Sequence, residues 1–291
     1  DGLVHVSRNG GETWDGATPA TIPDWALMSL IDASPHDPAT AWLAATRYKL
    51  NDFQPYIYVT RDYGKSWTKI TNGIPTNVFT RVVREDPTVP GLLYAGTEVG
   101  IYVSFDAGES WQPMGGTAPE TARLGLPVVP IHDLLIVGDE LLVCTHGRSF
   151  WILDDLTLVR QLANDDATGK AHLFQPKDTV RSKRLSGFGN SETPDRNYLF
   201  VGGIVQTYVS VTDYWGQKRR RFLDAGNNPD DGVVFYYNLA DEPKEPISLT
   251  ILDANGNEVR SFSSKPKNGS GDAKETYIPA IAGLNRFVWD M

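Results

Sequence analysis

The sequence predicts an all-β protein, and three observations support this fold class. An eight-residue turn motif occurs three times, and each copy lies between short runs of alternating apolar residues. The second half contains further strand-like runs separated by turn residues. Apolar residues make up 41% of the chain and charged residues 22%, which is typical of globular proteins and not of disordered ones.

The charge balance and the single cysteine narrow the classes of function. The 291 residues include 27 Lys and Arg against 36 Asp and Glu, so the formal net charge is −9, which argues against a nucleic-acid-binding surface. The one basic run, residues 218–221, is expected to be a solvated loop. No apolar run reaches the roughly 20 residues that a membrane span requires. Cys144 has no partner for a disulfide, and without Cys/His ligand spacing we expect no metal and no cofactor.

The recurring motif has the pattern [S/T]-x-[D/N]-x-G-x-[S/T]-W and predicts a hairpin turn; we call the copies at 7–14, 60–67 and 104–111 the Trp turns. The Asp or Asn can accept backbone hydrogen bonds, the Gly can adopt a positive φ, and the Trp can pack between sheets. We expect structural rather than catalytic roles for Asn9, Gly11, Trp14, Asp62, Gly64, Trp67, Asp106, Gly108 and Trp111.

The Trp turns belong to a longer repeat. Aligning residues 29–46 with 80–97 and with 132–145 equates Thr46 with Thr97 and gives units of four strands, the last without a Trp turn. Four antiparallel strands per unit are typical of a β-propeller blade, and propellers close with typically 4 to 8 blades. Because the chain holds about three and a half units, we expect exposed sheet edges that a homo-oligomer or missing N-terminal blades would cover.

The Trp turns resemble the Asp-box, or BNR repeat, of sialidases, sortilin-type receptors and two-propeller endoglucanases. Residues 145–155 (THGRSFWILDD) and 282–290 (AGLNRFVWD) are similar to segments of bacterial sortilin-like or BNR-repeat glycosyl hydrolases. The resemblance covers most of the chain, and Asn9 departs from the Asp of the family pattern. It implies a secreted or periplasmic protein that either binds ligands or hydrolyses glycosidic bonds.

We expect three regions along the chain: propeller blades over 1–160, a linker and loop over 161–197, and a truncated immunoglobulin-like β-sandwich over 198–291. The sandwich is predicted from strand candidates such as those flanking the Asn-Gly turn at 253–257. The Asp/Asn cluster of that turn lacks the Gly and Glu positions of a calcium-binding loop, so a simple turn is expected. Since the first residue is Asp and the last residues read as a strand, we expect a portion of a longer protein.

Candidate binding residues lie where the second strand of each unit ends, on the side opposite to the Trp turns. They are Arg47, Tyr48, Glu98, His146 and Arg148, and we expect them to converge and to bind a glycan or a polypeptide. The alternative for His146 and Arg148 is a structural role, capping a turn and pairing with Asp154 or Asp155.

The catalytic candidates are Glu98, Asp52 and His146, but they do not make a recognisable site. Glycoside hydrolysis requires two carboxyl groups at a defined separation. Arg47, Arg81 and Arg148 do not by their spacing establish a sialidase carboxylate clamp, and no Ser/His/Asp motif occurs. Three hypotheses stay open: a binding scaffold without a complete catalytic site, a glycoside hydrolase with catalytic residues partly outside this chain, and a spacer.

Overall fold

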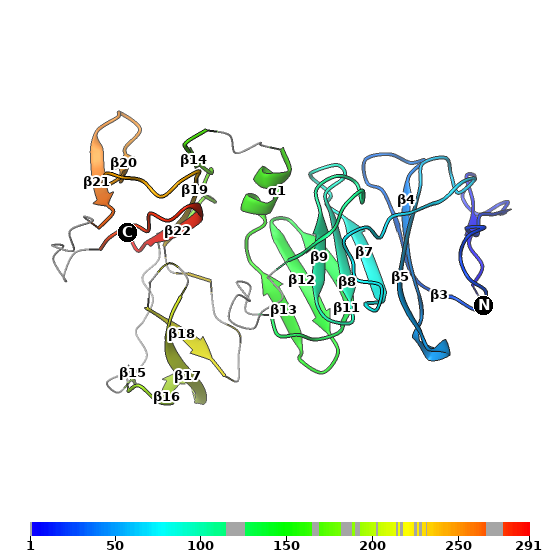
Figure 1. Cartoon of the computed structure of the whole chain (residues 1–291), viewed down its shortest axis with the longest axis horizontal. Coiled ribbons are helices and arrows are strands. Elements are labelled where there is room, and N and C mark those ends of the chain that lie inside the picture. Colours follow the sequence, from blue (N-terminus) through cyan, green and yellow to red (C-terminus); the bar gives the residue numbers. More distant parts are fainter. Residues whose placement is uncertain are drawn as a thin grey trace. The chain divides into compact units, whose positions relative to one another are not determined.

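The computed structural model describes residues 2–114, 126–164, 169–181, 188–189, 193–201, 203–213, 215, 218–223, 226, 229–230, 232–265 and 276–291. Nearly all elements in these ranges are antiparallel β-strands, and the ranges contain one α-helix (Figure 1). The chain divides into two compact units, Asp1–Asn164 and Asp165–Met291. No helix of the described ranges is long and apolar enough to cross a membrane.

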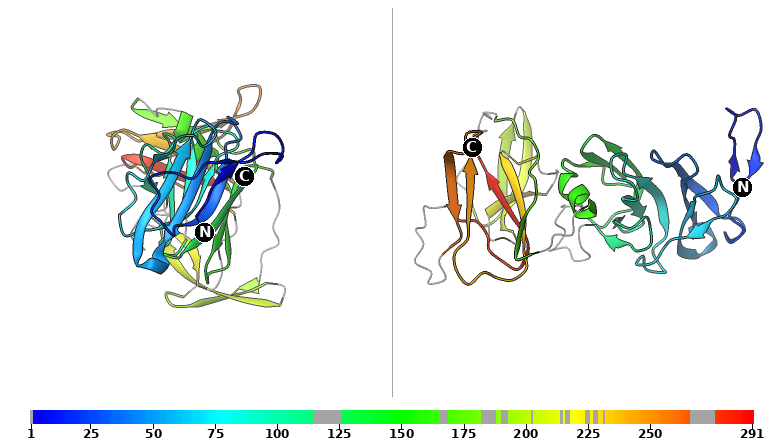
Figure 2. Two further views of the ribbon diagram at one scale, coloured as in Figure 1. Left: turned by 90° about the vertical axis from the view of Figure 1, so that its right-hand side faces the viewer. Right: turned by 90° about the horizontal axis from the view of Figure 1, so that it is seen from above.

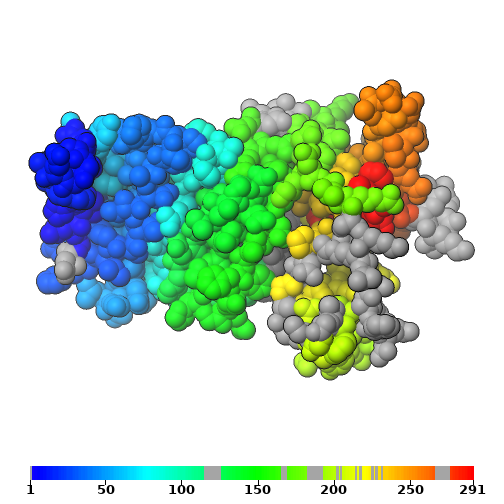
Figure 3. Space-filling view, turned by 180° about the vertical axis from the view of Figure 1, so that it is seen from behind, coloured from blue at the N-terminus to red at the C-terminus, as the bar shows by residue number. Residues whose placement is uncertain are grey.

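Four antiparallel sheets follow one another along the first unit, in chain order from blue to green (Figure 2). The space-filling view shows the same order of colours along this unit (Figure 3). The first sheet contains β1 (His5–Val6) and β2 (Asp15–Gly16). The second contains β3 (Leu27–Ala33), β4 (Ala41–Arg47), β5 (Asp52–Thr60) and β6 (Thr68–Lys69). The third contains β7 (Thr80–Glu85), β8 (Leu93–Thr97), β9 (Ile101–Ser104) and β10 (Gln112–Pro113). The fourth contains β11 (Ile131–Val137), β12 (Glu140–Thr145) and β13 (Phe150–Leu153), and α1 (Thr157–Asn164) follows it.

Each sheet packs against the next through buried apolar side chains. Because side chains alternate between the two faces of a strand, each sheet has a forward face, toward the next sheet in the chain, and a rear face, toward the preceding one. The core between the second and third sheets includes Trp42 and Ile57 from a forward face and Val83 and Leu93 from a rear face. This succession of packed antiparallel sheets is consistent with a β-propeller-like fold.

Strand pairing corrects the sequence alignment of the second and third sheets by one residue. Trp42 and Tyr94 each pair with the valine that directly precedes a Trp turn, so these two residues are equivalent. Counting along β4 and β8, the equivalent of Thr97 is Ala45 and not Thr46. Thr46 pairs with Leu27 of β3, and the register of β4 with β5 shifts between Ala45 and Arg47, which the sequence alignment could not reveal.

The second unit contains three sheets in its described ranges. One contains β14 (Ala171–Leu173), β19 (Val233–Leu239) and β22 (Gly283–Trp289). Another contains β15 (Phe188–Gly189), β16 (Asn197–Val201), β17 (Ile204–Thr212) and β18 (Lys218–Phe222). The third contains β20 (Ser248–Leu252) and β21 (Glu258–Ser263). Phe235, Phe262 and Phe287 belong to a shared apolar core.

Three features of this unit bear on the sequence expectations. The range 161–197, expected to be linker and loop, holds the last residues of α1 and the strands β14 and β15. The basic run 218–221, expected to be a loop, is part of β18, an edge strand that pairs with β17, and edge strands commonly carry charges. The turn at 253–257 forms as expected, because Asp253 Oδ1 accepts the N–H groups of Asn255 and Asn257, both at 2.8 Å. The immunoglobulin-like arrangement stays a prediction.

Candidate functional site

The three Trp turns share one hydrogen-bond pattern. Asp62 Oδ1 accepts the N–H of Ser66 at 2.9 Å and the hydroxyl of Thr60 at 2.8 Å. Asp106 and Asn9 accept the same two kinds of hydrogen bond in their own turns. These side-chain oxygens are therefore engaged within the turns.

The electrostatics of these turns also differ from those of a catalytic acid. Hydrogen bonds from the side chain and the backbone N–H of Ser66 lower the pKa of Asp62 to about 2. The pKa of Asp106 is lowered as well: burial acts to raise it, but the hydrogen bonds from Ser110 outweigh that effect. Both groups are carboxylates at neutral pH, whereas a general acid needs a raised pKa.

Two tryptophans of the turns connect neighbouring sheets. The indole N–H of Trp67 donates to the Ala17 carbonyl at 2.7 Å, and that of Trp111 donates to the Ile70 carbonyl at 2.8 Å. Both carbonyls belong to residues that follow the last strand of the preceding sheet. Trp14 has no preceding sheet in this chain; its indole N–H donates to a carbonyl of its own turn, and 62% of its surface is exposed.

An aromatic and charged cluster lies at the end of the sheets opposite to the Trp turns. Because neighbouring strands are antiparallel, the loops between the second and third strands of each sheet lie at this end. Tyr48 stacks on Phe79 with ring centroids 5.0 Å apart. The Arg81 guanidinium lies 5.2 Å and 4.9 Å from the centroids of these two rings. Glu98 Oε2 accepts hydrogen bonds from Arg81 Nε at 3.1 Å and from Arg81 Nη2 at 2.7 Å.

Two histidines extend this cluster toward the fourth sheet. The rings of His132 and His146 stack with centroids 4.8 Å apart. The pKa of His132 is lowered, first by burial and then by electrostatic interaction with Arg81 and His146, while Glu98 acts in the opposite direction. We call the following six residues the mouth cluster: Tyr48, Phe79, Arg81, Glu98, His132 and His146.

Arg47 and Asp52 form an ion pair of their own across the loop between β4 and β5. Arg47 Nη1 donates to Asp52 Oδ2 at 2.8 Å, and the Tyr56 hydroxyl donates to the same oxygen at 2.7 Å. The pKa of Asp52 is lowered, because the hydrogen bonds from Tyr56, Gln54 and Arg47 together outweigh the effect of burial. Burial and the neighbouring Asp52 raise the pKa of Tyr56 to about 12. This carboxylate holds the loop in place.

Two polar atoms at the base of the same loop have no hydrogen-bond partner in the described part of the chain: Thr46 Oγ1 and Arg47 Nε, both buried. In the third and fourth sheets the hydroxyls of Thr97 and Thr145 donate to carbonyls of the short loops that follow, at 2.8 Å and 2.6 Å. The second sheet has a longer loop at this place, with a 3₁₀ turn at Tyr48–Leu50.

The structure thus brings together three of the five predicted binding residues: Tyr48, Glu98 and His146. Arg47 contacts Asp52 instead. Arg148 is exposed, and its carbonyl accepts the indole N–H of Trp151 at 2.8 Å.

Of the acidic partners considered for Arg148, Asp155 has a structural position at the beginning of α1. Its Oδ1 accepts the N–H of Thr157 at 2.9 Å and the hydroxyl of the same residue at 2.6 Å. It therefore acts as a cap of the helix.

Sequence reasoning missed Phe79 and His132, and it considered Arg81 only as a sialidase-type arginine. Arg81 and His132 are equivalent, since each is the second residue of the strand that comes first in its sheet, β7 or β11. The first strand of each sheet begins at the end of the sheet where the loops of the mouth cluster lie. A comparison of strand beginnings would have shown a charged or aromatic residue at this position in two sheets.

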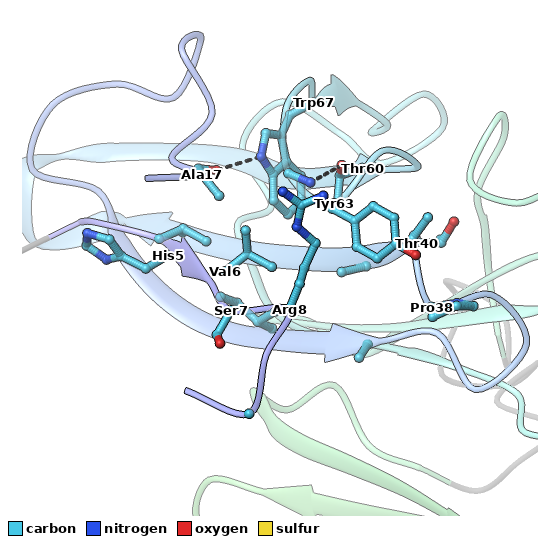
Figure 4. A pocket seen from close by; sticks show the side chains of 17 residues that line it. His5, Val6, Ser7, Arg8, Ala17, Pro38, Thr40, Thr60, Tyr63 and Trp67 are labelled. Atoms are coloured by element: carbon cyan, nitrogen blue, oxygen red, sulfur yellow. Dashed lines mark hydrogen bonds between the residues drawn. The ribbon is translucent and has the colours of Figure 1, made fainter. Parts of the chain in front are cut away.

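No group of three or more His, Cys, Asp or Glu side chains in the described ranges could hold a metal ion. A cavity of about 720 Å³ lies elsewhere, between residues of the first two sheets (Figure 4). None of the mouth-cluster residues lines it. Within the mouth cluster Phe79 is buried, whereas His132 and His146 are exposed.

No family model and no curated protein matches the sequence. Among solved structures, YCF48 bound to D1 peptide is 15% identical, with a TM-score of 0.39, over 70% of this chain and 57% of that chain. YCF48 from Cyanidioschyzon merolae is 16% identical, with a TM-score of 0.38, over 99% of this chain and 88% of that chain. The GH74 xyloglucanase from Xanthomonas campestris is 14% identical, with a TM-score of 0.34, over 84% of this chain and 32% of that chain. These similarities assign the chain to no family.

Proposed function

We propose that this chain is a β-propeller scaffold that binds a polypeptide or a glycan at the mouth cluster. The observation that carries the proposal is the convergence of stacked aromatic rings, an arginine–glutamate pair and two histidines at one end of the sheets. Aromatic faces stack on sugar rings and on apolar peptide side chains, and a few fixed polar groups orient a ligand. In finer terms we propose a BNR-repeat or sortilin-like protein with about three and a half Asp-box blades.

A binding assay with variants tests this proposal. Arrays of glycans and of short peptides would supply a ligand, and calorimetry would measure its affinity for each variant. We expect Tyr48→Ala and Arg81→Ala to weaken binding at least tenfold, or about 1.4 kcal/mol, because both remove part of the stacked surface. Lys65→Ala, in a Trp turn at the other end of the sheets, is the matched control and should bind normally. Unchanged affinity in both cluster variants would rule out the site.

The alternative function is glycoside hydrolysis, with Glu98 as a catalytic carboxyl group and Asp52 as its partner. A glycosidase needs two carboxyl groups that face the scissile bond, whereas Glu98 and Asp52 each accept a hydrogen bond from an arginine of this chain. We therefore propose that this chain has no complete catalytic site. Hydrolysis of arylglycosides or polysaccharides that is abolished by Glu98→Gln would favour the alternative.

We also propose that further sheets cover the ends of the first unit, either from missing N-terminal blades or from a second copy. On the forward face of the fourth sheet, Phe150 and Ile152 are 77% and 53% exposed. Strand pairing makes them equivalent to Ile101 and Val103, which are buried against the fourth sheet. Light scattering that gives the mass of two or more chains would favour the second copy over missing blades.

A further inference from the structure

We propose that the mouth cluster binds an acidic segment of a polypeptide, and that the protonated rings of His132 and His146 hold a carboxylate of that segment. This ligand class rests on the proposed function of the site and makes it more specific. Binding of such a ligand is expected to strengthen as the pH falls below neutral, because only the protonated form of the two rings carries charge.

The ring nitrogens of the two histidines are free to bind a ligand. Both side chains are exposed, and neither ring makes a hydrogen bond within the described ranges. The ring of His36 differs, since its Nε2 lies 2.8 Å from the Asp86 carbonyl oxygen. A protonated histidine has two N–H donors and no acceptor. In that form the rings of His132 and His146 offer donors that the mouth cluster does not use itself.

The stacking of the two rings couples their protonation to a bound anion. Their centroids are 4.8 Å apart, with 22° between the ring planes, so two imidazolium charges repel each other. Burial and electrostatic interaction with Arg81 and His146 hold the pKa of His132 below its ordinary value of 6.5. A carboxylate placed on the rings opposes these effects and favours the charged form. Binding of a carboxylate therefore takes up protons.

The two histidines set the net charge of the cluster. Arg81 Nη2 and Glu98 Oε2 are 2.7 Å apart, and their charges cancel. The neighbouring Arg47 and Asp52 also form an ion pair, at 2.8 Å. With neutral histidines these groups carry no net charge, whereas protonation of the rings makes the site positive. Because the whole chain has a formal net charge of −9, the mouth cluster then differs in sign from the rest of the surface.

The charged neighbours of the histidines in the chain do not offset this change. Asp133 directly follows His132, but its Oδ1 pairs with Arg84 Nη2 at 3.0 Å. Arg148 lies two residues beyond His146, is exposed, and adds positive charge. An anionic group is thus the complement of the protonated site.

The surroundings of the cluster favour a polypeptide over a glycan. Stacking on a sugar ring requires an open aromatic face, whereas Phe79 is buried and covers one face of Tyr48. Exposed apolar side chains lie beside the charged groups instead: Phe53, with its ring 6.1 Å from that of Phe79, is 45% exposed, and Val99 is 41% exposed. They fit a peptide in which apolar residues flank an acidic one.

The test uses the full chain and two capped peptides, GSLEFELGSG and its glutamine counterpart GSLQFQLGSG. Calorimetry measures the affinity for each at pH 5.5 and at pH 8.0. A glutamate side chain, with an ordinary pKa of about 4.3, stays ionised across this range, so a change in affinity reports on the protein. We expect the acidic peptide to bind about tenfold more tightly at pH 5.5 than at pH 8.0, and the glutamine peptide to show no such gain.

Histidine variants assign the effect to the two rings. In His132→Gln combined with His146→Gln, we expect the gain at low pH to disappear, because glutamine does not titrate. His5→Gln, at an exposed histidine of β1 outside the mouth cluster, is the matched control and should keep the full gain. NMR of the ring protons should show that the acidic peptide raises the pKa of His132, a shift that a purely structural role does not produce. Circular dichroism would verify that the variants fold.

The possible outcomes separate this proposal from the proposed function. If Tyr48→Ala weakens binding of the acidic peptide but its affinity does not depend on pH, the binding site stands and the role of the histidines is wrong. If Tyr48→Ala leaves the affinity unchanged, the peptide binds elsewhere and both proposals fail. Equal affinity for the two peptides at pH 5.5, or no binding of the acidic one, would overturn the carboxylate assignment. Binding of polygalacturonate but of neither peptide would identify an acidic glycan and contradict the polypeptide.

Discussion

Asn9, Asp62 and Asp106 occupy the same position of three turns and accept the same hydrogen bonds, although only two of them are charged. The side-chain amide of Asn9 donates to Thr13 where the aspartates accept from a hydroxyl, so the turn tolerates the exchange. At this position the turn needs an acceptor oxygen on Cγ of the side chain, as Asp and Asn both provide, and the negative charge is secondary.

Asp62→Asn should therefore fold at neutral pH and reduce the acid sensitivity of the first unit. The pKa of Asp62 in the folded chain is about 2, below its ordinary value of 3.8, so its carboxylate stabilises the fold above about pH 4. That contribution is lost as the pH falls toward 2, and an asparagine does not titrate. Thermal unfolding between pH 7 and pH 2 checks this: the Tm of the variant should fall less than that of the wild type. An equal fall in both would contradict the prediction.

The mouth cluster shows how far residue-level reasoning from sequence reaches. Tyr48, Glu98 and His146 were found because equivalent loops were compared. Phe79 and His132 were missed because Phe79 directly precedes β7 and His132 lies in β11. Aromatic residues are common in strands, where they usually pack in the core. Phe79 stacks on Tyr48 of the second sheet, and His132 stacks on His146 beyond the next strand of its own sheet. Contacts between segments so far apart in the sequence are not encoded in local spacing.

At the scale of elements, the glycines of the Trp turns let neighbouring sheets approach closely. Gly64 and Gly108 have φ of +79° and +89°, where other residues are strained. A Cβ on Gly64 would lie 2.6 Å from the Ala17 Cβ, and one on Gly108 would lie 2.4 Å from the Ile70 Cδ1. Glycine and tryptophan thus act at the same contact, which explains why the sequence motif contains both.

The helix α1 was not expected from the sequence, and a distant contact holds it in place. Arg160 Nε donates to both oxygens of Asp86, at 3.2 Å and 3.0 Å, and its other nitrogens donate to Asp139 and to the Gly138 carbonyl. The Asp86 side chain is fully buried. Asp86 lies in the turn between β7 and β8, 74 positions before Arg160. A local sequence pattern therefore could not predict this contact.

Arg160→Leu should destabilise the first unit by about 3–5 kcal/mol, because it leaves the Asp86 carboxylate buried without a charged partner. Denaturant unfolding followed by fluorescence measures the change in the free energy of unfolding. The control is Arg8→Leu, which breaks a 3.6 Å ion pair with Asp15 between exposed side chains and should change stability by less than about 0.5 kcal/mol. The double variant Arg160→Leu with Asp86→Asn should recover part of the loss. Equal effects of the two arginine variants would contradict this role of Arg160.

At the scale of the whole molecule, the succession of sheets was predictable because the Trp turns mark the same point in each sheet. The details that failed depend on backbone irregularity. The alignment was wrong by one position next to the register shift between Ala45 and Arg47, and the strand β18 was read as a loop because its residues are basic. Charge and loop length vary freely at edges and loops, so they are poor guides to strand boundaries.

The same repeat explains why the two ends of the first unit differ from its interior. The third sheet has both faces covered, whereas Ile31 of the second sheet and Phe150 of the fourth are exposed at positions whose equivalents in the third sheet, Val83 and Ile101, are buried. We propose ligand binding at neither end but on the rim that carries the mouth cluster.

The most direct test of this account is the footprint of a bound ligand by hydrogen–deuterium exchange, with the strongest peptide or glycan from the arrays. We predict protection in residues 47–53, 79–81 and 98, and in the segments that carry His132 and His146, with no change in the Trp turns at 60–67 and 104–111. Protection of those turns, with the mouth cluster unaffected, would contradict the assignment of structural and binding roles to the two rims.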